Sequence, residues 1–144
     1  MQLVPYIPEV ATYKIFYPQN FILNDEEESG IVTITSPEGQ NMTLSSYRAS
    51  VGITEDVLLS FFEDLTKDYN SISELRSITT GHYLSCEQHF TKGEYYWIWW
   101  LYAKSKQIIA ISVNSEKELN KEEYNLFRFV ADNMEIFNEE ENAD

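Results

Sequence analysis

Two histidines and the single cysteine are the residues of this sequence whose chemistry could serve catalysis or metal binding. His82 and His89 lie seven residues apart on one predicted strand, so their side chains point to opposite faces of a sheet. Cys86 shares the His82 side, but four residues of extended chain separate those two by about 13 Å. Because that separation is too large for two ligands of one ion, the sequence predicts no metal site and no cofactor.

Cys86 is also the candidate nucleophile, and its sequence neighbours do not activate it. A reactive thiol needs a nearby base or positive charge, whereas Cys86 is flanked by Ser85 and Glu87. Leu84 and Phe90 lie on its side of the predicted strand, which favours a buried structural thiol. The sequence contains no G-x-S-x-G turn and no glycine-rich phosphate loop. We therefore expect a protein without enzymatic activity.

Acidic residues predict the kind of partner. The chain has 24 acidic and 10 basic residues, a formal net charge of -14, which argues against nucleic acid binding. Acids attract a basic protein through complementary charge. The four consecutive acids of a predicted loop lack the alternating spacing of an EF-hand calcium loop. The candidate partner-binding acids lie in that loop and on the last predicted helix: Asp25, Glu26, Glu27, Glu28, Glu122, Glu123, Asp132 and Glu135.

The stretch EYYWIWWLY, residues 94–102, contains six aromatic residues in nine. In a strand, Tyr96, Trp100 and Tyr102 share one face, while Trp97 and Trp99 lie on the other. Large side chains on both faces predict a central strand that is covered on both sides. The alternative is an aromatic cleft in which Tyr96, Trp100 and Tyr102 bind a small ligand or a peptide.

Two amphipathic helices can provide that cover. The first follows Thr54 as N-cap and ends near residue 70, with this apolar stripe: Val57, Leu58, Phe61, Phe62, Leu65 and Tyr69. The second follows Asn120 as N-cap, with Glu123 at the capping-box position. Its stripe continues through Leu126, Phe127, Val130, Met134 and Phe137. The helices lie on opposite faces of the sheet or together on one.

The remaining periodic runs are predicted strands. They cover residues 13–18, 31–36, 42–50, 75–80, 81–90, 94–104 and 107–114, with Gly39 at positive φ in the turn between the second and third. Strands that are segregated in this way from two helices indicate an α+β fold with an antiparallel sheet of about six to seven strands, in the order β-β-β-α-β-β-β-β-α. We expect a single domain over 1–144, with a core of about 12–138 and a frayed acidic tail at 139–144.

A family resemblance rests on the first strand and the last helix. The segment YKIFYPQNF contains Phe16, Tyr17, Pro18 and Phe21, and the last predicted helix ends in MEIF at Phe137. Together with the order of elements, these residues resemble the Mog/PsbP-like fold over residues 12–138. The resemblance implies an antiparallel sheet between helices. It also implies a protein that binds partners, since members include a Ran-binding nuclear transport factor and the PsbP photosystem subunit.

These observations together favour a bacterial, cytoplasmic protein-interaction module, such as an immunity-type or adaptor protein with a basic partner. The N-terminus lacks the basic and apolar regions of a signal peptide, and a lone cysteine fits a reducing compartment. No apolar run is long enough to span a membrane. The alternatives are a carrier that uses the aromatic cleft, and, if a signal peptide or lipobox has been removed, an accessory domain of an envelope lipoprotein.

Overall fold

The computed structural model describes residues 2–9, 12–26, 28–79 and 83–137, and these form an α+β fold. The strands are β1 (Leu3–Tyr6), β2 (Tyr13–Pro18), β3 (Ile22–Glu26), β4 (Ile31–Thr35), β5 (Asn41–Arg48), β6 (Asn70–Ser71), β7 (Arg76–Thr79), β8 (Leu84–Lys92), β9 (Tyr95–Lys104), β10 (Gln107–Ser115) and β11 (Glu135–Ile136). The helices are α1 (Glu55–Thr66) and α2 (Lys121–Asp132). The predicted fold class is confirmed.

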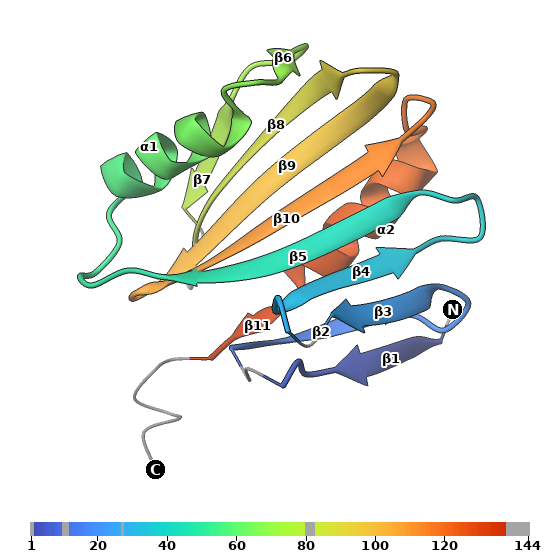
Figure 1. The fold of residues 1–144 in the computed structure, drawn as a ribbon, viewed down its shortest axis with the longest axis horizontal. Helices are drawn as coiled ribbons and strands as arrows, with labels where there is room; N and C mark the ends of the chain where they lie inside the picture. The colour runs from blue at the N-terminus through green and yellow to red at the C-terminus, as the bar shows by residue number, and fades with distance from the viewer. Residues whose placement is uncertain (1, 10–11, 27, 80–82, 138–144) are drawn as a thin grey trace.

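The main sheet is antiparallel and has eight strands, slightly more than predicted. Its order is β3-β4-β5-β10-β9-β8-β6, and β7 also pairs with β8. The chain builds most of it with hairpins, in which Gly39 (φ +86°) and Gly93 (φ +62°) take the left-handed conformation that suits glycine. Strand β9, which contains the tryptophans, pairs with β8 on one side and β10 on the other, so it lies inside the sheet (Figure 1).

Three predicted elements differ from the structure, and two of the differences involve a second, small sheet. It has the order β1-β2-β11, so the first predicted strand, β2, does not join the main sheet. The predicted loop position of Asp25 and Glu26 is wrong, because both residues belong to the edge strand β3. The helical position of Glu135 is also wrong, because Glu135 lies in β11 and pairs with Lys14 of β2.

Both helices begin at the predicted caps. The Thr54 side chain accepts a hydrogen bond from the Val57 amide, and Asn120 and Glu123 form a complete capping box. Both helices end earlier than predicted, α1 at Thr66 and α2 at Asp132. After α2, the buried apolar residues continue through Met134 into β11 instead of through another helical turn. Each helix has 12 residues, and no helix in the described ranges has the length and apolarity needed to cross a membrane.

The helices cover opposite faces of the main sheet (Figure 1). Leu58 and Phe62 of α1 belong to one core with Leu101, and Phe127 of α2 belongs to the other core with Trp100. Trp100 and Leu101 are neighbours in β9 and are 2% and 0% exposed, so both faces of this strand are covered. The central-strand interpretation of residues 94–102 is therefore confirmed. Val57 is an exception to the predicted α1 stripe, because it is 42% exposed.

Candidate functional site

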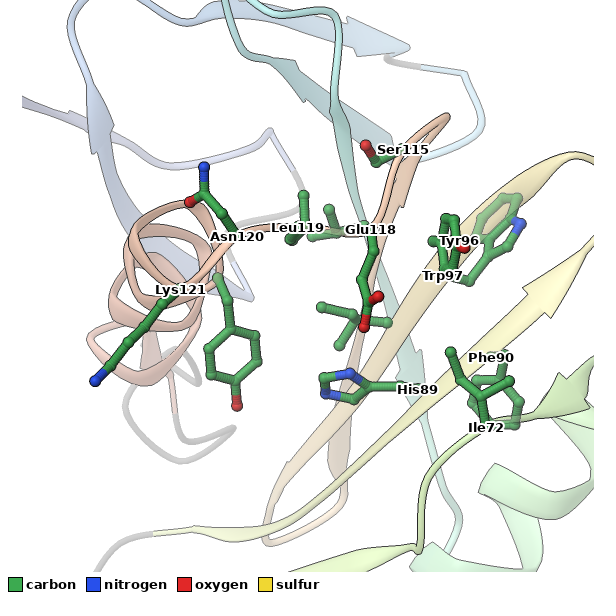
Figure 2. Close-up of a pocket in the computed structure, with 13 residues that line it drawn as sticks. Ile72, His89, Phe90, Tyr96, Trp97, Ser115, Glu118, Leu119, Asn120 and Lys121 are labelled. Atoms are coloured by element: carbon green, nitrogen blue, oxygen red, sulfur yellow. The ribbon is translucent and has the colours of Figure 1, made fainter.

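A pocket of about 220 Å³ lies where the main sheet meets the start of α2, and we call it the aromatic pocket (Figure 2). Strands β8, β9 and β10, the segment leading into α2, and α2 itself contribute its principal lining residues: His89, Tyr96, Ile98, Val113, Leu119 and Tyr124. They come together because the sheet face that α2 covers extends beyond the first turn of the helix. Glu118 projects into the pocket from the loop before α2, towards His89.

The buried carboxylate of Glu87 is hydrogen-bonded to two residues that line this pocket, His89 and Tyr124. Glu87 is 5% exposed, and its oxygens accept hydrogen bonds from Trp100 Nε1 at 2.6 Å and from the Tyr124 hydroxyl at 2.6 Å. His89 Nε2 lies 2.9 Å from the same carboxylate. Since Tyr124 belongs to α2 and the other three residues belong to β8 and β9, these bonds attach the helix to the sheet at the pocket.

The hydrogen bonds keep Glu87 ionised. Burial raises the pKa of this carboxyl group, but the bonds from His89, Tyr124 and Trp100 lower it by more, to about 2. The same arrangement raises the pKa of the Tyr124 hydroxyl to about 12, through burial and the bond to Glu87. Because an ionised carboxylate has no proton to donate, His89 must carry the proton on Nε2.

The lowered pKa of Glu87 predicts a contribution to acid unfolding. The folded-state pKa of about 2 lies below the ordinary value of 4.5, so the ionised group stabilises the fold above pH 4.5. That contribution, about 3 kcal/mol at neutral pH, is lost as the pH falls from 4.5 towards 2. Unfolding free energies measured across this range should fall less steeply for Glu87→Gln than for the wild type. Parallel curves would contradict the prediction, since the two proteins share every other acid.

A second concave surface, the acidic recess, adjoins the aromatic pocket and shares Ser115, Glu118 and Asn120 with it. Four glutamates and one lysine line the recess: Glu38, Glu116, Glu118, Glu123 and Lys117. Glu38 comes from the turn between β4 and β5, whereas the others come from the end of β10 to the first turn of α2. Gln40 donates a 2.7 Å hydrogen bond to Glu123 and so joins these two parts of the chain.

The predicted aromatic cleft does not form as proposed. Trp100 and Tyr102 are 2% and 4% exposed, so they belong to the core, where the Tyr102 hydroxyl donates to Asp132. Both point towards α2, which covers the middle of that sheet face. Tyr96 is 36% exposed and lines the aromatic pocket, which lies beyond the helix.

The predicted acids lie on two separate parts of the surface, as the two candidate segments implied. Asp25 and Glu26 end β3 and Glu28 lies in the β3–β4 turn, whereas the acidic recess lies at the opposite end of β4. Asp132 is occupied by Tyr102 and Arg128, and Glu123 by its capping box. Glu122 and Glu135 are exposed, and Glu27 lies outside the described residues.

Cys86 has the buried environment that its neighbours predict. It is 1% exposed in the core under α1, and burial raises the pKa of its thiol to about 12. A thiol with this pKa is protonated at neutral pH, so it is a poor nucleophile. Within the described ranges, no three His, Cys, Asp or Glu side chains are placed to hold a metal ion, and His82 lies outside those ranges.

Sequence reasoning missed Glu87, Glu38, Glu116 and Glu118. A signal for Glu87 was present, because an acid at a central-strand position that faces inward must find hydrogen-bond donors. The other three glutamates, which line the recess, gave no such signal, because each lies in a polar connection that is typical of a solvated surface.

Comparison with known proteins finds solved structures that are similar to this chain. CyanoP, the PsbP of the cyanobacterium Synechocystis sp. PCC 6803, matches with a TM-score of 0.69 at 14% identity, over 94% of this chain and 93% of CyanoP. The fold is PsbP-like. A Bacteroides thetaiotaomicron protein also matches with a TM-score of 0.69 at 14% identity, over 97% of this chain, but the chain spans only 50% of that protein.

LpqN of Mycobacterium tuberculosis, a protein involved in cell envelope biogenesis, matches with a TM-score of 0.66 at 10% identity, over 95% of this chain and 91% of LpqN. No family model and no curated protein matches the sequence of this chain. At these identities the comparison shows the PsbP-like fold alone, because one fold carries many functions.

Proposed function

We propose that this protein is a non-enzymatic interaction module that binds a basic protein partner through the acidic recess. The observation that carries the proposal is the gathering of Glu38, Glu116 and Glu118, from two separate parts of the chain, around one concave surface. Lys117 is the single lysine in that lining. A concave surface of one charge concentrates its field and accelerates the approach of an oppositely charged partner.

The neighbouring aromatic pocket gives the same partner a place for an anchor side chain. Binding energy at protein interfaces is concentrated in a few side chains that fill pockets, and charged contacts around them add rate and selectivity. Pockets that enclose drug-sized ligands measure about 300–1,000 Å³. A pocket of about 220 Å³ is smaller, so its size favours one side chain of a partner over the ligand of a carrier protein.

The proposed module is cytoplasmic. A cytoplasmic location agrees with the lone Cys86, which is buried and has no disulfide partner. The second candidate function is an accessory domain of an envelope protein, which the structural similarity to LpqN favours. Fractionation of cells that express the native gene distinguishes these two, since an envelope domain would be recovered with the membrane or periplasmic fraction.

The proposal predicts an association that depends on salt and on the recess. A partner captured from native lysate would be identified and purified, and its association rate measured from about 50 to about 300 mM salt. We expect Glu38→Gln with Glu116→Gln to slow association several-fold at low salt, by about tenfold at most, and to flatten the salt dependence. The matched control is Glu63→Gln with Asp64→Asn on α1, which covers the opposite sheet face.

Two outcomes would overturn this proposal. One is a partner whose association rate does not change with ionic strength. The other is an equal loss of rate in the recess variant and the α1 control, which would show that overall charge matters and the recess does not.

A further inference from the structure

His89 presents a hydrogen-bond acceptor to the aromatic pocket. Its Nε2 carries the proton that the Glu87 carboxylate accepts at 2.9 Å, so in the neutral ring the other nitrogen, Nδ1, has a free lone pair. The described residues supply no hydrogen-bond donor to Nδ1, and His89 lines the pocket. A ligand with N–H groups can therefore donate to this nitrogen.

Glu118 adds a negative charge beside that acceptor. Its side chain extends from the loop before α2 into the pocket, towards the His89 ring (Figure 2). Tyr96 lies across the pocket from the start of α2. Aromatic faces attract a cation that lies within about 6 Å of the ring centroid. The lining thus combines acceptors, one carboxylate and aromatic rings, which together suit a cationic group on an apolar stem.

The groups near the start of α2 that could bind an anion are either hydrogen-bonded already or point away from the pocket. A helix N-terminus attracts anions through its free N–H groups, but the Asn120 side chain accepts from the Glu123 amide, and the Glu123 side chain accepts from the Asn120 amide. Glu122 and Glu123 also place two negative charges in the first turn. The amine of Lys121 points away from the pocket in Figure 2.

We infer that the aromatic pocket binds a lysine or arginine side chain of the partner, with the cationic group between Glu118 and His89 Nδ1 and the methylene stem against Ile98 and Leu119. This inference rests on the proposed function, since it names the anchor of the basic partner. It makes Glu118 the residue that selects a charged anchor over an apolar one. A long basic side chain suits the site because its stem is apolar and its head is charged.

The test uses small probes that imitate the anchor. Butylammonium and butylguanidinium would be titrated into the intact protein, with 1-butanol as the neutral analogue, at constant ionic strength. Two-dimensional ¹H–¹⁵N spectra would follow the backbone amides of Tyr96 and Leu119. We expect saturable shifts with dissociation constants of about 1–10 mM for the cations, and binding at least about fivefold weaker for the alcohol.

Matched variants assign the effect to the pocket. Glu118→Gln should weaken butylammonium binding by about fivefold while leaving butanol unchanged, and Tyr96→Leu should weaken both cations. Glu63→Gln, on the opposite face, should change neither. Equal binding of alcohol and ammonium, or an unchanged affinity in Glu118→Gln, would overturn the inference. If the recess variants still slow association with the partner in that case, the proposed function stands without the cationic anchor.

Discussion

Replacing Glu87 with alanine is expected to lower the free energy of unfolding by about 3–5 kcal/mol, the range seen when one member of a buried charged network is removed. The substitution leaves Trp100 Nε1 and the Tyr124 hydroxyl without their acceptor. Trp100 is 2% exposed, so water cannot replace the lost hydrogen bond at its indole without opening the core. The attachment of α2 to β8 beside the aromatic pocket is lost at the same time.

Urea denaturation followed by tryptophan fluorescence measures this effect. Glu87→Gln should lose less stability than Glu87→Ala, because the amide oxygen still accepts one of the bonds. The control is Glu94→Ala, an exposed acid in the β8–β9 turn, which should change stability by less than about 0.5 kcal/mol. A loss for Glu87→Ala no larger than for Glu94→Ala would show that the three hydrogen bonds contribute nothing to the fold.

Truncating Leu101 to alanine is expected to cost about 2–5 kcal/mol. Leu101 is 0% exposed on the sheet face that α1 covers, among Phe62, Cys86 and Phe90. Removing three carbon atoms there loses their transfer free energy and leaves a cavity that the surrounding side chains fill only in part. The loss of stability therefore measures how closely the residues under α1 pack against this face of β9.

Two further variants separate burial from strand propensity in the same strand. Leu101→Met keeps the volume and should cost less than about 1.5 kcal/mol. Tyr95→Ala removes a 44% exposed ring from β9 and should cost clearly less than Leu101→Ala. If Tyr95→Ala and Leu101→Ala were equally destabilising, the α1 face would not be a packed core, and the sheet would depend on backbone pairing alone.

Much of the fold could be predicted because its signals are local. Thr54 and Asn120 cap helices through side chains three residues from their partners, which a short window of sequence contains. Alternation in β9 predicted that Trp100 and Leu101 point to opposite faces, and both are buried. The short strands β3 and β11 were not predicted, since an acidic strand at the sheet edge and a two-residue strand carry no periodic pattern.

The candidate site was predicted less well for a physical reason. Tyr102 was a candidate residue of the aromatic cleft, but α2 covers it, and its hydroxyl donates to Asp132 thirty residues away. Burial and this hydrogen bond raise the pKa of the Tyr102 hydroxyl above its ordinary value. Strand alternation predicts which face of the sheet a side chain occupies. It does not predict how far along that face a helix covers the strand.

The sequence by itself determined the α+β class, the helix caps, the two-sided central strand and the acidity of this protein. These depend on side-chain period and composition, which are properties of neighbouring residues. Tertiary structure decided the site. It brought Glu87 to Trp100, 13 residues away, and to Tyr124, 37 residues away, and it joined Gln40 to Glu123 across 83 residues. Such pairs depend on how the chain crosses itself in space, and no local pattern encodes that crossing.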